Sequence, residues 1–173
     1  MKHLVQRILK AGSLLLMTAV VVTTGCQQKP DPSLKLKPLV DKYVEVWNGG
    51  KLEGLDAIID PHFVYHPNLS PVVEGVDGLK KQIAGFRAAY PDLKLVVEDG
   101  VYAENESAGR WTLTGTNTGS GVMPPTGKTV KIWGISMLHF ANGKITEEWV
   151  GFDNQSFMEQ LGYTMTPPSE TKH

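Results

Sequence analysis

The chain has 173 residues, a formal net charge of −1 and a single cysteine. One cysteine excludes a disulfide framework within the chain and a metal site built from several cysteines. The lysines are scattered rather than clustered, which argues against nucleic acid as a partner.

The first 25 residues have the features of a secretory signal peptide. Three basic residues precede an apolar run over residues 11–22, which is too short to span a bilayer comfortably. The run ends in Thr23-Thr24-Gly25-Cys26, which resembles a bacterial lipobox, although Thr23 replaces the more usual Leu. We therefore expect an exported protein that is lipid-anchored at Cys26 in the cell envelope, on the periplasmic or outer-surface side. Ordinary signal-peptidase cleavage and a short membrane anchor are the alternatives.

The rest of the chain is predicted to hold one domain. Residues 26–33 are polar and contain two prolines, as expected of a tether, and residues 164–173 are expected to form a flexible tail. Residues 34–163 are enough for a single core. Because residues 1–25 hold three of the 17 basic residues and no acidic one, the exported part carries 14 basic and 18 acidic residues.

Apolar residues at helical spacing predict three helices in the first half of this domain. The first covers residues 34–48 and ends at Gly49-Gly50; the second starts at residue 52 and stops at Asp60-Pro61. A short extended piece over 63–66 follows. The third helix is capped by Asp77 and ends at Pro91.

From residue 93 the pattern changes to that of strands. Alternating or β-branched stretches cover 93–98, 101–104, 110–119, 129–140 and 144–153, with a hairpin signal at Asn142-Gly143. A last helix, 155–161, ends at Gly162. This order predicts an α+β domain with helices packed on one face of a curved antiparallel sheet.

Several short motifs occur in a characteristic order between residues 37 and 163. They are Phe63-Val64-Tyr65-His66-Pro67, Tyr90-Pro91-Asp92, Arg110-Trp111-Thr112-Leu113-Thr114-Gly115, Pro124-Pro125-Thr126-Gly127-Lys128, Phe140-Ala141-Asn142-Gly143-Lys144-Ile145, and the segment from Glu148-Trp149 to Gln160-Leu161-Gly162. In this order the chain resembles a SnoaL-like domain, the polyketide cyclase and ester cyclase branch of the nuclear transport factor 2-like superfamily.

The resemblance implies a cone: a strongly bent antiparallel sheet wrapped around about three N-terminal helices, with a short C-terminal helix. It also implies a ligand cavity inside the cone and a homodimer through the outer sheet face. The fold hosts isomerases, cyclases and hydrolases as well as binding modules, so it does not fix the function.

Two positions depart from the aromatic polyketide cyclases of this family. Those enzymes use an aspartate on the last strand as general acid/base and a histidine on the preceding strand; the matching positions here are Val150 and Ser136. Valine has no proton to exchange, so the cyclase mechanism does not carry over. Whether the chain is an enzyme stays open.

The parity of the last strand decides which acid faces the cavity. The resemblance places positions 136 and 150 inward, which a three-residue bulged turn achieves by pairing Ser136 with Glu148. A two-residue turn would instead pair Ser136 with Trp149. In the bulged register Glu148 points inward, whereas Glu147 and Trp149 point outward with the residues of the neighbouring strand (Trp133, Ile135, Met137). So apolar an outer face suggests a dimer contact through Trp133 and Trp149.

Glu148 is the candidate acid/base, because burial in such a cavity would raise its pKa toward the range useful for proton transfer; a hydrogen-bonded or rim residue with a structural role is the alternative. His66 aligns with a polar pocket position of the cyclases. It would contact the ligand, take part in catalysis or pair with Glu148, unless it is a structural histidine beside Pro67. His62 and His66 have metal-motif spacing, but Pro61 and Pro67 argue against the required helix, and we expect neither a metal nor a cofactor.

Further ligand contacts are expected from the helices and one strand. Tyr43 and Trp47 lie one turn apart on the first helix and Phe86 on the third, either lining the cavity or packing in the core. Arg110 would bind an anionic ligand or pair with a carboxylate such as Asp92 or Asp153. Asp153 is itself the expected N-cap of the last helix.

Three functions remain open at this point. The chain binds a small hydrophobic, carbonyl-type ligand; or it is an isomerase, cyclase or hydrolase with Glu148 as base; or it is a dimeric interaction module whose cavity is filled by its own side chains.

Overall fold

The computed structural model describes residues 31–166 except 69, 122 and 165. The signal peptide, Cys26, most of the tether and the end of the tail lie outside the described residues. The helices are α1 (Ser33–Gly49), α2 (Leu55–Ile58, after a 3₁₀ turn at Leu52–Gly54), α3 (Gly75–Ala89) and α4 (Asn154–Leu161). The strands are β1 (Ile59–His66), β2 (Val73–Glu74), β3 (Lys94–Tyr102), β4 (Glu106–Thr116), β5 (Thr129–Ala141) and β6 (Lys144–Phe152).

Local chemistry explains several of the helix ends. α1 ends at Gly49, and the following Gly50 caps it with a positive φ of 67° and an N–H that donates to the Val46 carbonyl oxygen at 2.8 Å. Asp153 caps α4, accepting the Ser156 N–H at 2.9 Å, as expected. The prediction that Asp77 caps α3 is wrong, because the helix already begins at Gly75 and Asp77 lies in its first turn.

The six strands form one sheet in the order β2-β1-β6-β5-β4-β3. The sheet is mixed rather than wholly antiparallel, because β1 pairs with β6 in parallel. The two strands expected over 93–104 are a single strand, β3, which shifts register between Val97 and Asp99 as it pairs with β4. Glu98, which has no partner between these two pairs, therefore marks a bulge in one continuous strand, and the chain turns only after Tyr102.

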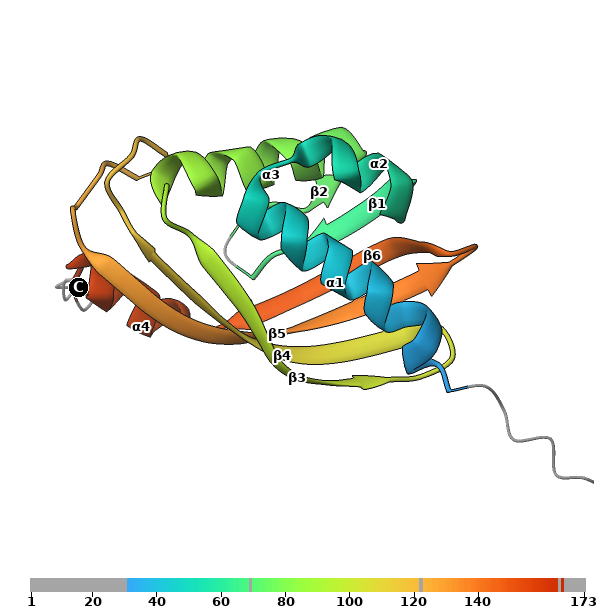
Figure 1. Cartoon of the computed structure of the whole chain (residues 1–173). Coiled ribbons are helices and arrows are strands. Elements are labelled where there is room, and N and C mark those ends of the chain that lie inside the picture. The colour runs from blue at the N-terminus through green and yellow to red at the C-terminus, as the bar shows by residue number, and fades with distance from the viewer. Residues whose placement is uncertain (1–30, 69, 122, 165, 167–173) are drawn as a thin grey trace, which may run out of the picture.

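The helices α1, α2 and α3 lie on the concave side of the bent sheet (Figure 1). The short helix α4 packs beside β5, at the left of the view. The most deeply buried side chains come from α2, α3 and the strands under them, including Leu55, Phe63, Leu79, Ile83 and Ile145. This is the predicted cone of the α+β class. Within the part of the chain that the structure describes, no helix is both long and apolar enough to cross a membrane.

Candidate functional site

The β5–β6 hairpin turns Glu148 toward the inside of the cone. Its turn is the two-residue type, with Ala141 opposite Lys144 and positive φ at Asn142 and Gly143. A bulge at Thr146 then shifts the register, so that Leu138 is opposite Glu148. The predicted pairing of Ser136 with Glu148 was wrong, but the predicted parity is confirmed, because the bulge lies in the strand instead of the turn.

Ser136 and Val150 are direct partners across the two strands, and both line the same cavity as Glu148. Trp133, Ile135, Met137 and Trp149 point the other way, with 40–57% of their surface exposed. The inner and outer faces of the sheet are therefore the ones expected from the sequence.

The Glu148 side chain is 5% exposed and meets Tyr43 from α1. The Tyr43 hydroxyl donates a hydrogen bond of 2.6 Å to Glu148 Oε2. On the β1 side its register partner is Tyr65, which also lines the cavity. A helix and two strands thus bring one carboxyl group and two phenols to the same region.

Burial raises the pKa of Glu148 from 4.5 to about 7, because the charged form loses its hydration; the hydroxyls of Tyr43 and, more weakly, Ser136 hold it below what burial alone would give. Burial and the nearby carboxylate raise the pKa of Tyr43, which stays a neutral donor. A carboxyl group with this pKa is present as both acid and base near neutral pH, which is what general acid–base chemistry requires.

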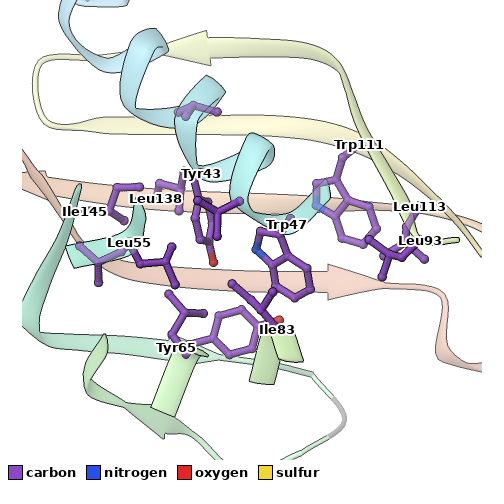
Figure 2. Packing of buried hydrophobic residues seen from close by; sticks show 14 of the residues in the cluster. Tyr43, Trp47, Leu55, Tyr65, Ile83, Leu93, Trp111, Leu113, Leu138 and Ile145 are labelled. Atoms are coloured by element: carbon purple, nitrogen blue, oxygen red, sulfur yellow. The ribbon is translucent and has the colours of Figure 1, made fainter. Parts of the chain in front are cut away.

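The cavity lies between α1 and the sheet and has a volume of about 90 Å³. This is open space for several water molecules, so the cone is not filled by its own side chains. Nine of the lining residues are aromatic, and among the described lining residues Glu148 is the sole acidic or basic one. In Figure 2 Tyr43, Trp47, Tyr65 and Trp111 point into this interior from α1, β1 and β4.

The helix residues predicted to contact a ligand do line the cavity. Trp47 packs edge-on against Tyr43 at 6.4 Å and against Phe86 at 5.8 Å between ring centroids. The three aromatic side chains form one continuous wall along α1 and α3.

His66 does not reach the cavity, so its predicted contact with a ligand or with Glu148 is corrected. Its ring lies on the outer face of the sheet, stacked on Trp149 at 3.7 Å, with Nε2 2.8 Å from Glu147 Oε1. His139 bonds the other oxygen of Glu147 at 2.6 Å. Bonds from His139 and then His66 lower the pKa of Glu147. Strand alternation in β1, which buries Tyr65, leaves His66 outside.

The predicted contact of Arg110 with an anionic ligand is also wrong. Its Nη2 lies 2.7 Å from Asp99 Oδ2 across the β3–β4 pair, and it is not among the lining residues. A pairing with a carboxylate was one of the two expectations, but Asp92 accepts from Thr116 and Asp153 caps α4 instead.

Tyr65 and Trp111 are among the aromatic residues of the site that the sequence analysis did not predict. Tyr65 could have been found from the alternation of Phe63 and Tyr65 in β1. Trp111 was visible as part of a motif, but nothing local predicts that its indole Nε1 donates to Ser136 Oγ at 3.0 Å. Among the described residues no group of three or more His, Cys, Asp or Glu side chains is arranged to hold a metal ion.

The model of the SnoaL-like polyketide cyclase family matches residues 37–161. The chain belongs to this family. Solved structures agree: the chain resembles TsrD from Streptomyces laurentii at 22% identity and a TM-score of 0.68, covering 75% of this chain and 96% of that one. It resembles a candidate polyketide cyclase from Bacillus cereus ATCC 10987 at 28% identity and a TM-score of 0.60, covering 72% of this chain and 78% of that one. It resembles wild-type IdmH from Streptomyces antibioticus at 26% identity and a TM-score of 0.63, covering 73% of this chain and 98% of that one. No curated protein matches.

As a SnoaL-like domain, the chain has the cone of the family and a cavity inside it. Val150 and Ser136 line the cavity where the aromatic cyclases of the family were expected to carry their working groups. Glu148, two residues earlier on the same strand face, is the acid that this cavity holds.

Proposed function

We propose that this SnoaL-like domain is exported, lipid-anchored, and binds a small hydrophobic compound with a carbonyl group. The observation that most supports ligand binding is the composition of the cavity: aromatic and aliphatic walls around one buried carboxyl group. Pockets for small molecules typically combine such apolar walls with a few aimed polar groups.

The carboxyl group favours a neutral acceptor on the ligand. The protonated form of Glu148, present below its pKa of about 7, can donate to a carbonyl oxygen. An anionic ligand would face an acid and no basic side chain among the described lining residues, which costs electrostatic energy.

A thermal-shift and native mass spectrometry screen tests the binding. Steroid-, terpene- and polyketide-like ketones are compared with analogues in which the carbonyl is reduced to a methylene. We expect ketones to bind at least about tenfold more tightly, the difference of one lost hydrogen bond to a buried group. Glu148→Leu should remove this preference, whereas His66→Gln, on the outer face, should keep it. If no compound of any class binds, the proposal fails.

A second candidate is an enzyme in which Glu148 is a general base. The carboxyl group with a pKa near 7, bonded to Tyr43, favours it, because the ionised form can take a proton from a carbon next to a carbonyl. In deuterated water a bound ketone should then exchange that hydrogen faster than in free solution, measured by NMR, and Glu148→Gln should stop the exchange. No acceleration would leave binding alone.

The lipid anchor is proposed from the lipobox-like sequence Thr23-Thr24-Gly25-Cys26. Mass spectrometry of the protein from a bacterial membrane fraction should find a lipid on Cys26, and Cys26→Ser should release the protein into the soluble fraction. Membrane fractionation unchanged by this substitution would contradict lipidation.

The homodimer is proposed through the outer sheet face. Trp133 is 57% exposed and Trp149 48%, and both lie on this face with Ile135 and Met137. Exposed apolar side chains gathered on one face are typical of a protein contact surface.

A further inference from the structure

Trp111 occupies a place on the inner face of the sheet that a glycine makes available. It lies on β4 directly opposite Gly134 on β5. A Cβ at position 134 would collide with the six-membered ring of Trp111 and would lie 2.7 Å from the Gly151 carbonyl oxygen. The indole therefore lies over Gly134 and extends along β5.

From this position the indole reaches Ser136, two residues further along β5. Its Nε1 donates to Ser136 Oγ at 3.0 Å. An indole N–H can only donate, so it must use an acceptor site of the hydroxyl oxygen. The hydroxyl proton of Ser136 is left for another acceptor. Glu148 is the carboxyl group available to it, because Ser136 is opposite Val150 and Glu148 lies two residues from Val150 on the same, cavity-lining face of the neighbouring strand.

We propose that Trp111 is a positioning residue: its indole N–H occupies the Ser136 oxygen and so directs the Ser136 hydroxyl proton toward the carboxyl group of Glu148. The carboxyl group then has hydroxyl donors on two sides: Tyr43 on α1, and Ser136, held by Trp111, on the sheet. Trp111 touches neither the carboxyl group nor a reacting atom; it acts through Ser136.

The ionisation of Glu148 agrees with this arrangement. The Ser136 hydroxyl lowers the pKa of Glu148, after the stronger contribution of Tyr43. A hydroxyl whose oxygen already accepts a hydrogen bond is polarised and becomes a better donor. Losing the indole N–H should therefore weaken the Ser136 contribution and raise the pKa of Glu148. The inference concerns the same site as the proposed function, but its test needs no ligand.

The test follows the Glu148 carboxyl carbon by NMR against pH in protein labelled at the glutamate carboxyl; the signal is assigned by its loss in Glu148→Gln. Trp111→Phe should raise the pKa of Glu148 by about half a unit, the size of a weak hydrogen bond. Ser136→Ala should raise it at least as much, and Ser136→Thr, which keeps a hydroxyl, should retain the wild-type value.

The decisive measurement is Trp111→Phe in the Ser136→Ala background. If Trp111 acts through Ser136, the substitution changes the pKa no further there. An equal rise in both backgrounds, no rise in either, or no effect of Ser136→Ala would overturn the proposal. Phe152→Leu is the control for lost volume, because Phe152 packs beside Trp111 at 6.3 Å between ring centroids and has no polar group. It should leave the pKa unchanged, and a rise as large as that of Trp111→Phe would also overturn the proposal.

Discussion

Burial of Glu148 makes the stability of the domain depend on pH. Its pKa is raised from 4.5 to about 7 in the folded protein, so the folded state binds the proton more tightly than the unfolded state. This contribution is fully present below pH 4.5 and is lost as the pH rises toward about 7. We expect the free energy of unfolding to fall by about 3 kcal/mol over this window relative to Glu148→Gln, measured by denaturant unfolding of both proteins.

Glu147 provides a control of opposite sign on the same strand. Hydrogen bonds from His139 and His66 lower its pKa, so its contribution is present above the ordinary carboxyl pKa of 4.5 and is lost as the pH falls through its folded value. The curve of Glu147→Gln should therefore differ from wild type on the acidic side. Parallel curves for wild type and Glu148→Gln between pH 4.5 and about 7 would contradict the burial of an ionisable Glu148.

The Tyr43 hydroxyl is the strongest single group acting on the Glu148 carboxyl. Tyr43→Phe keeps the ring that packs on Trp47 but removes the 2.6 Å donor. We expect the pKa of Glu148 to rise by about one unit, since a hydrogen bond to a charged group contributes on the order of 1.5 kcal/mol. The carboxyl NMR titration measures it. Tyr65→Phe is the control, because no bond joins the Tyr65 hydroxyl to Glu148, and an equal shift there would count against the assignment.

For single residues, the sequence analysis placed Glu148 correctly and His66 wrongly, and strand parity explains both results. Glu148 was placed by strand parity, a two-residue period counted from positions 136 and 150, which the family resemblance puts inward. His66 was placed by its position in a motif shared with cyclases, which ignores parity. Applied to β1, parity puts Tyr65 inside and His66 outside, as observed. The hydrogen bond from Trp111 to Ser136 joins β4 to β5 across the space left by Gly134, and no pattern of neighbouring residues in the sequence predicts it.

The β5–β6 hairpin shows how far sequence reasoning reaches at the scale of an element. The Asn142-Gly143 pair predicts the hairpin, and both residues adopt the positive φ that a two-residue turn of this type needs. The bulge at Thr146 was not predicted in that place. The parallel ladder of β6 with β1 also shifts register there, between Ile145 and Glu147. That parallel pairing joins segments far apart in sequence and leaves no periodic trace.

Gly143 tests the backbone requirement of this turn. Its φ is +74° and a Cβ would meet no atom within 4 Å, so substitution costs backbone energy alone. Gly143→Ala should lower the free energy of unfolding by about 1 kcal/mol, measured by denaturant unfolding. Gly49→Ala is the matched control: it also has open space and lies in α1 without a positive φ. It should be neutral or stabilising by a few tenths of a kcal/mol. Equal effects at both sites would refute this reason.

At the scale of the whole molecule, the sheet separates two surfaces with different chemistry. The concave side holds the cavity and Glu148, and the convex side carries Trp133, Ile135, Met137 and Trp149. The family fold was predictable because motif order covers most of the domain. The ligand was not, because this family shape fits both turnover and capture, and the chemistry depends on a few side chains.

The convex face predicts that the domain is a dimer in solution and that single charges on it separate the subunits. Ile135→Lys or Trp133→Glu should convert a dimeric mass to a monomeric one in sedimentation and light-scattering measurements of the unlipidated domain, because each would place an unpaired charge in an apolar contact. Val72→Glu is the control: Val72 is 51% exposed but lies between β1 and β2, off this face. A wild-type monomer, or a dimer that survives both convex-face charges, would contradict the proposed contact. Neither charge touches the cavity, so ketone binding should persist in the monomer; its loss would mean that the two faces are coupled through the sheet.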